Sequence, residues 1–179
     1  MKLLRSNKIT LRPIIRSDIN EKYVSWLNDP NVNCFLETRF SVQTLDTVLR
    51  YWSEHNGDSL SPWWAICRVD EHHRHIGNIK LGPIHPIHSK ADISLFIGDR
   101  NSWGFGFATQ AITLVRDHAF NDLLIHKISA GIYSNNIASI RAFEKCNFTL
   151  EATLKHEAIL SGSLRVDVLR YGLINPRFM

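Results

Sequence analysis

The stretch SWGFGFATQA, Ser102 to Ala111, decides the fold. It places two glycines among three large aromatic residues, directly after the β-forming run ADISLFIG (91–98) and at the start of ATQAITLVRDHAF (108–120), whose apolar residues recur at helical spacing. Gly104 and Gly106 are therefore predicted to lie where a strand turns into a helix. Such a turn presents unpaired backbone N–H groups at the positive end of a helix dipole, so we expect it to bind a phosphate group.

Two familiar phosphate-binding turns do not fit this spacing. A P-loop ends in Gly-Lys-Ser/Thr, but Phe107-Ala108-Thr109 stands there and supplies neither the lysine nor a magnesium ligand. A Rossmann turn needs glycine or alanine where Thr109 stands, near the start of a βαβ unit, whereas the strands before this turn read as an antiparallel hairpin. A third kind of turn is therefore indicated.

WGFGFATQA (103–111) resembles the pyrophosphate loop Q/R-x-x-G-x-G/A of the GNAT acyltransferases, in the WGKGYATEA form of the branch similar to the RimJ and RimL N-terminal acetyltransferases. In this resemblance Trp103 replaces the usual Gln or Arg, and Gly106 and Ala108 take the G and G/A places. A second motif of the branch, N-x-x-S-(x)4-E-K-x-G-F, is similar to NNIASIRAFEKCNF through Asn136, Ser139, Glu144, Lys145 and Phe148. The N-terminal runs ITLRPI and WLNDPNV also resemble the branch, so the likeness spans nearly the whole chain.

The resemblance implies an α+β fold, with residues 1–179 forming a single acyltransferase domain. Its sheet would be mixed, largely antiparallel and twisted, flanked by helices and splayed in the middle between ADISLFIG (91–98) and HKISAGIY (126–133). The gap opened by that splay would admit the pantetheine arm of CoA. Asn147, where the family usually has glycine, is expected to take the left-handed conformation that ends the preceding helix.

Acetyl-CoA is the acyl-donor cosubstrate that the resemblance implies. The pyrophosphate would be bound by the glycine turn, namely Trp103, Gly104, Phe105, Gly106, Phe107, Ala108 and Thr109. The backbone of Phe96 and Ile97 would pair with the pantetheine arm, and the Asn136 side chain would contact it. Asn136 equally suits the N-cap of the short helix that follows, and the two roles are compatible.

Two residues are candidates for the proton transfers of acyl transfer to an amine. Glu157 lies in a segment similar to the part of RimL-like enzymes that carries a glutamate drawing the amine proton, and a solvated strand carboxylate is the other interpretation. Ser139 is the candidate acid for the departing thiolate, because Phe143 stands where many GNAT enzymes carry a tyrosine and cannot donate a proton. A plain helix-surface serine is the alternative for Ser139.

The remaining elements follow from apolar periodicity and turn residues. Asp18 is the expected N-cap of a helix over 19–29, and Ser41 that of a helix over 42–55. Strands are expected within KITLRPI (8–14), in a hairpin at 63–69 and 75–84, and at 126–133. A short helix should cover 136–146, and a terminal hairpin should turn at Ser161 and Gly162.

Composition limits the function classes. The chain of 179 residues is 44% hydrophobic and carries a formal charge of +4, but Lys and Arg are scattered, so no nucleic-acid partner is expected. No run approaches the ~20 apolar residues of a membrane span, and three dispersed cysteines suggest a reducing compartment; a cytoplasmic protein is expected.

His72, His73 and His75 have no second ligand cluster, so no metal is expected. The oligomeric state is not readable.

The leading functional hypothesis is acetyl transfer from the CoA thioester to a primary amine by direct attack. The RimJ and RimL likeness implies a protein N-terminus as the acceptor. An alternative acceptor is a small-molecule amine such as an amino sugar, because VSWLNDPNVNCFLETRF (24–40) is also similar to acyltransferases of surface-sugar pathways. A non-catalytic CoA-binding module is a further alternative, since Phe143 cannot act as an acid.

Overall fold

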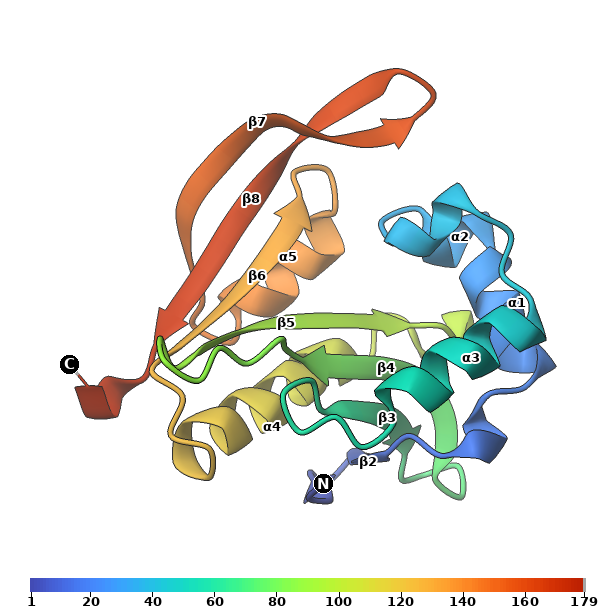
Figure 1. The fold of residues 1–179 in the computed structure, drawn as a ribbon, viewed down its shortest axis with the longest axis horizontal. Helices are drawn as coiled ribbons and strands as arrows, with labels where there is room; N and C mark the ends of the chain where they lie inside the picture. The colour runs from blue at the N-terminus through green and yellow to red at the C-terminus, as the bar shows by residue number, and fades with distance from the viewer. Residues whose placement is uncertain (179) are drawn as a thin grey trace.

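The computed structural model describes residues 1–178, which form one eight-stranded sheet in the order β1-β2-β3-β4-β5-β6-β8-β7 (Figure 1). The strands are β1 (Leu4–Arg5), β2 (Ile9–Pro13), β3 (Trp63–Arg68), β4 (Arg74–Leu81), β5 (Lys90–Ile97), β6 (Lys127–Tyr133), β7 (Thr149–Ser161) and β8 (Leu164–Ile174). The helices are α1 (Glu21–Asn28), α2 (Pro30–Asn33), α3 (Leu45–His55), α4 (Phe107–Asn121) and α5 (Ile137–Glu144), with short 3-10 turns η1 (Arg16–Asp18), η2 (Glu37–Phe40), η3 (Arg100–Ser102) and η4 (Pro176–Phe178).

The sheet splays between β5 and β6. These strands run parallel and pair only from Lys90–Lys127 to Asp92–Ser129, whereas the other neighbouring strands are antiparallel. Beyond that point β5 stays paired with β4 and β6 stays paired with β8, so the two halves diverge (Figure 1). The predicted α+β architecture, with its mixed, mostly antiparallel sheet and central splay, is confirmed.

Two apolar clusters cover the two faces of the sheet. Along β4, Ile79 and Leu81 belong to the larger cluster, which packs against α4 and α5. The alternate positions Asn78 and Lys80 lie on the opposite face, where α1 and α3 pack with Trp63 over a smaller cluster. Strand alternation therefore leaves polar side chains on the face that α1 and α3 cover.

The N-cap of α1 differs from the expectation. Asn20, not Asp18, caps this helix, and its side chain accepts a hydrogen bond from the Tyr23 N–H at 3.1 Å. Asp18 instead lies in η1, where the Arg12 guanidinium donates two bonds of 2.6 Å to its carboxylate and the Ile15 N–H donates a third. A guanidinium contributed by a neighbouring strand thus binds the carboxylate, which local spacing does not reveal.

The start of α3 was also predicted wrongly. The helix begins at Leu45, and Thr44 is its N-cap, accepting a bond from the Thr47 N–H at 3.2 Å. Residues 41–43 stay outside the helix because the Asn28 side chain accepts from the Gln43 N–H at 2.9 Å. A contact with α1 therefore delays the helix that Ser41 was expected to begin.

The predicted hairpins and the helix end at Asn147 are confirmed. Asn147 has φ 67°, the left-handed conformation expected of it, and β7 and β8 pair up to Ser161–Leu164. The β7–β8 hairpin curves over the end of β6 toward α2 (Figure 1). None of the helices in residues 1–178 has the length and hydropathy that a membrane crossing requires.

Candidate active site

The glycine turn is open at both glycines. Gly104 has φ 82° and Gly106 φ 79°, values that L side chains rarely adopt, and a Cβ at either position would meet nothing within 4 Å. Gly106 is the N-cap of α4, and the first helical bond runs from the Gln110 N–H to the Gly106 carbonyl at 3.1 Å. The N–H groups of the first turn, Phe107 to Thr109, therefore have no partner inside the helix and follow directly on the two open glycines, an arrangement that suits a pyrophosphate.

Side chains before the turn fix its position. The Trp103 Nε1 donates to the Ile97 carbonyl at 2.8 Å, which ties the turn to the end of β5. The buried Asp99 accepts from the Ser102 hydroxyl at 2.6 Å and pairs with Arg74 at 2.8 Å. Burial would raise the pKa of Asp99, but these two partners hold it below its usual value. The turn is thus attached to both β5 and β4.

The two phenylalanines of the turn pack together rather than standing over the glycines. Their rings lie 5.9 Å apart and stack, and the Arg68 guanidinium of β3 lies 5.0 Å from the Phe107 ring and 5.5 Å from the Phe105 ring. Phe107 is buried and Phe105 is exposed. Both aromatic side chains are therefore used to hold the turn on β3, which leaves their backbone N–H groups as the parts available to a phosphate.

The edge of β5 that faces the gap presents the Ile97 peptide. The Gly98 N–H donates to Ile76 of β4 at 2.8 Å, while the Ile97 carbonyl points away from β4 to Trp103. Because peptide groups alternate along a strand, those of Phe96 point toward β4 and those of Ile97 toward the gap. Of the two residues predicted to pair with pantetheine, Ile97 is thus the better placed.

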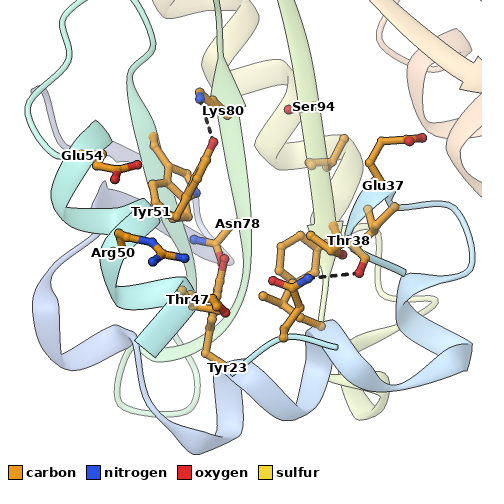
Figure 2. A pocket seen from close by; sticks show the side chains of 17 residues that line it. Tyr23, Glu37, Thr38, Thr47, Arg50, Tyr51, Glu54, Asn78, Lys80 and Ser94 are labelled. Atoms are coloured by element: carbon orange, nitrogen blue, oxygen red, sulfur yellow. Dashed lines mark hydrogen bonds between the residues drawn. The ribbon is translucent and has the colours of Figure 1, made fainter. Parts of the chain in front are cut away.

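A cavity of about 570 Å³ lies beside this edge, between α3 and the β4–β5 surface (Figure 2). Phe96 and Ser94 of β5 line it, together with Asn78 and Lys80 of β4. Its other lining residues come from α1, η2, α3, β3 and the segment before α3 (Tyr23, Leu27, Leu36, Glu37, Thr38, Gln43, Thr47, Val48, Arg50, Tyr51, Glu54, Trp63) and from β5 (Leu95). The cavity and the splay therefore share the last residues of β5.

A polar link joins the two halves of the molecule at the rim of this cavity. The Tyr133 hydroxyl, at the end of β6, donates to the Glu37 carboxylate and accepts from the Arg39 guanidinium at 3.0 Å. Burial and the neighbouring Glu37 raise the pKa of Tyr133 above its usual value. Arg39 also donates to the Ile159 carbonyl of β7. Sequence reasoning did not single out these residues, although Glu37 and Arg39 lie in the stretch 24–40, because their contact with Tyr133 joins segments far apart in the chain.

The predicted residues of α5 lie at its first turn. The Asn136 side chain accepts from the Ser139 N–H at 3.2 Å, so its N-cap role is present in the structure. The Ser139 side chain is half-buried. Phe143 is buried and packs edge-on against Phe148 at 5.0 Å, inside the larger apolar cluster. α5 begins just after β6, so Asn136 and Ser139 follow the strand that borders the gap.

Glu157 lies apart from the cavity. It is exposed on β7, inside an irregularity of the β7–β8 pairing between Leu154 and Ala158. The neighbouring Lys155 and the His156 N–H both bind Asp167 of β8, at 2.8 and 2.9 Å. Among the described residues that line the cavity, the carboxylates are Glu37 and Glu54 and do not include Glu157.

One histidine of the β3–β4 hairpin, His75, packs next to the cavity wall. His75 is largely buried and stacks on Tyr23. Its Nε2 lies 2.9 Å from the Gly77 carbonyl oxygen and 3.2 Å from the Asn78 amide oxygen. Because a carbonyl oxygen only accepts, this nitrogen is the donor toward Gly77. Burial lowers the pKa of His75, so its neutral form supports the cavity wall at Asn78.

A sheet split beside an open glycine turn, with a cavity of about 570 Å³ along the same strand, is the arrangement expected of a CoA-dependent acyltransferase. Residues 8–149 match the sequence pattern of the acetyltransferase (GNAT) domain family. The chain belongs to this family and is a GNAT N-acetyltransferase.

Curated relatives of the full chain agree with this family. The uncharacterized N-acetyltransferase p20 of Bacillus licheniformis is 26% identical over 180 residues, covering 99% of each chain. The spermidine N(1)-acetyltransferase of Escherichia coli (strain K12) is 26% identical over 178 residues, which cover 89% of this chain and 83% of the relative. The fold is that of the spermidine N-acetyltransferase from Vibrio cholerae in complex with CoA and spermine, with a TM-score of 0.85, 23% identity, and 97% and 99% of the two chains covered.

Proposed function

We propose that this chain transfers the acetyl group of acetyl-CoA to the primary amine of a small molecule by direct attack. The observation that carries the proposal is the position of the cavity. Ser94 and Phe96 line it, and both lie beyond Asp92, the last residue of β5 that pairs with β6. An amine in the cavity therefore lies beside the gap into which a thioester would extend. We also propose that residues 1–179 act as one acyltransferase domain.

The donor is proposed to lie along the turn and the gap. The N–H groups of Gly104 to Thr109 and the fixed Trp103 would bind the pyrophosphate, since the turn offers unpaired donors and free space. The pantetheine arm would pair with the N–H of Ile97, beside Phe96, because the Ile97 carbonyl already accepts from Trp103. The Asn136 side chain is proposed to contact the pantetheine arm while it caps α5. The cap uses only its carbonyl oxygen, which accepts from the Ser139 N–H, so its NH₂ group can donate to the arm.

Two observations favour a small-molecule amine over a protein N-terminus. The named relatives with assigned acceptors are spermidine acetyltransferases, whose acceptor is a small amine. The cavity is bounded by η2 and the first turns of α3 on one side and by β4 and β5 on the other, and at about 570 Å³ it is of the size that encloses small ligands. Polyamines and amino sugars are the first acceptors to examine.

The proton transfers have two sets of candidates. Glu157 as base and Ser139 as acid follow from the resemblance, and Glu157 would reach the acceptor through water. Glu37 and the Tyr133 hydroxyl form a second pair, since Glu37 lines the cavity and Tyr133 ends the strand that borders the gap. An amine with a pKa of about 8 is partly deprotonated near neutral pH and needs little help from a base. An amine with a pKa near 10.4 is about two pKa units harder to deprotonate and depends more on the base.

Release of the free CoA thiol tests the proposal. The protein is incubated with acetyl-CoA and, separately, with polyamines, amino sugars, amino acids and peptides with free N-termini. We expect amine-dependent thiol release with one class of small amine and none above background with the peptides. Tight acetyl-CoA binding without any amine-dependent release would instead support a CoA-binding module, and peptide-dependent release would favour a protein acceptor.

A further inference from the structure

Two cations stand on one side of the cavity without a carboxylate partner. Arg50 of α3 and Lys80 of β4 both line it, and neither forms an ion pair within residues 1–178. The Lys80 ammonium donates to the neutral Tyr51 hydroxyl at 3.2 Å. Figure 2 shows the Arg50 guanidinium pointing toward Asn78, with Lys80 and Tyr51 on the same side. This side of the cavity thus offers charged donors to a bound molecule.

The carboxylates of the cavity do not balance these cations. Glu37, on the opposite side in Figure 2, is bonded to Tyr133 and lies 3.8 Å from the buried guanidinium of Arg39, which offsets its charge. Glu54 is the other lining carboxylate, one helical turn beyond Arg50 on the same side of the cavity; both side chains are exposed, and in the described part of the chain no ion pair joins them. With Arg39 counted beside Glu37, three cations face two carboxylates, a net charge of +1 that favours an anionic group over a polycation.

We propose that the acceptor amine carries an anionic group, a carboxylate or a phosphate, which binds to Arg50 and Lys80. This inference rests on the proposed function and names the class of its acceptor. A guanidinium and an ammonium both form strong, charge-assisted hydrogen bonds to such groups. The Tyr51 hydroxyl and the Asn78 amide lie on the same side and add neutral polar groups.

The strand register gives this binding mode a direction. Lys80 pairs with Ser94 across β4 and β5, and Asn78 pairs with Phe96 two residues nearer the end of β5. An anion held between Lys80 and Arg50 would leave the rest of the acceptor to extend over β5 toward the gap. The amine would then approach the thioester with its anionic group turned away from it.

Matched pairs of amines test the proposal. For phosphate, O-phosphoethanolamine is compared with ethanolamine and glucosamine 6-phosphate with glucosamine. For carboxylate, β-alanine is compared with β-alanine amide, and spermidine serves as the polycation. We expect kcat/KM to be at least about 10-fold higher for the anionic member of one pair, the effect of one or two charged hydrogen bonds. The pair that shows the preference identifies the anion.

Two variants connect that preference to the cations. Arg50→Gln and Lys80→Met should each lower the ratio of kcat/KM for the anionic amine to that for its neutral partner by roughly 10-fold. Arg5→Gln and Lys8→Met remove the same charges from exposed positions near the far edge of the sheet, and these controls should retain the preference. Arg50→Glu should favour spermidine relative to the wild type.

The outcomes separate this inference from the proposed function. Turnover of spermidine or of neutral amines, with no loss in the Arg50 and Lys80 variants, would overturn the anionic acceptor and keep the acetyltransferase. If no amine in the panel is turned over, isothermal titration of the protein with each amine decides. Preferential binding of the anionic members that Arg50→Gln abolishes supports the inference, and equal binding of both members contradicts it.

Discussion

The Trp103 indole donates to the Ile97 carbonyl at 2.8 Å and so joins the glycine turn to the strand that borders the gap. The turn and the gap are therefore held at a fixed separation, as one CoA molecule lying across both would require. Trp103→Phe keeps an aromatic ring but removes the donor. We expect affinity for acetyl-CoA to fall roughly 3- to 10-fold, the effect of one neutral hydrogen bond. Isothermal titration with acetyl-CoA measures it, and an unchanged dissociation constant would show that the anchor does not position the turn.

Gly106→Val should abolish donor binding. A valine side chain would occupy the open space where the phosphate is proposed to lie, at a backbone φ of 79° that a β-branched residue does not tolerate well. Gly57→Val is a matched control, because Gly57 has φ 87° and equally open surroundings but lies in the turn after α3, away from this site. Thermal unfolding with and without acetyl-CoA compares them. A ligand at 100 times its dissociation constant adds about 2.7 kcal/mol, and this gain should be lost in Gly106→Val alone.

The glutamates are distinguished by their pH–rate profiles. If Glu157 takes the amine proton, Glu157→Gln should lower turnover by about 100-fold near neutral pH, and the loss should shrink at high pH, where the amine deprotonates unaided. Donor affinity should be nearly unchanged. Glu37→Gln is the comparison, since Glu37 lines the cavity and Glu157 does not. A wild-type profile for Glu157→Gln with a large loss in Glu37→Gln would transfer the base role to Glu37.

Ser139→Ala should behave differently from the glutamate variants. A residue that protonates the thiolate affects every turnover, so the reaction should slow across the whole pH range. The effect should be modest, because the CoA thiol is acidic enough to leave without help. The pH–rate profile of Tyr133→Phe, measured under the same conditions, tests the other hydroxyl near the gap. If Ser139→Ala retains the wild-type rate and Tyr133→Phe does not, the acid is Tyr133.

Asp18 stabilises the helical region that borders the cavity. Burial would raise its pKa, but the bonds from Arg12 and Ile15 hold the pKa below its usual value. Because the folded pKa lies below the unfolded value of about 3.9, this stabilisation is present above that pH and is lost as the pH falls through the folded pKa. Asp18→Asn should lower the free energy of unfolding by about 2–3 kcal/mol at pH 7, and by much less in acid.

Urea unfolding at pH 7 and near pH 3 measures this difference. Asp46→Asn is the control, since Asp46 is an exposed carboxylate of α3. An equal loss for Asp18→Asn at both pH values would show that the packing of this side chain, and not its charge, is responsible.

Local sequence determined the parts of the site that lie within one continuous segment. The glycine turn at the start of α4, the Asn136 cap and the left-handed Asn147 each depend on a few neighbouring residues, and each was predicted at its position. The splay followed from the family resemblance rather than from any pattern in β5 or β6. Positions that are set by backbone conformation, such as Gly106, were thus the easiest to predict from the sequence.

The cavity could not be predicted in the same way. Its wall combines Tyr23, Trp63 and Phe96, each of which has the pattern of an ordinary core residue. The bond between Tyr133 and Glu37 joins residues 96 positions apart, so no local spacing encodes it. The incorrect caps at Asp18 and Ser41 have the same cause, because Arg12 binds the Asp18 carboxylate and Asn28 holds Gln43 outside the helix.

Mass spectrometry of the acceptor tests the central claim most directly. The protein is given acetyl-CoA labelled in the acetyl group, together with an equimolar mixture of small amines and peptides with free N-termini. The account predicts that one class of small amine gains the labelled acetyl on nitrogen, in an amount equal to the CoA released, and that Gly106→Val forms no such product. Label found on peptide N-termini, or only in free acetate, would contradict it.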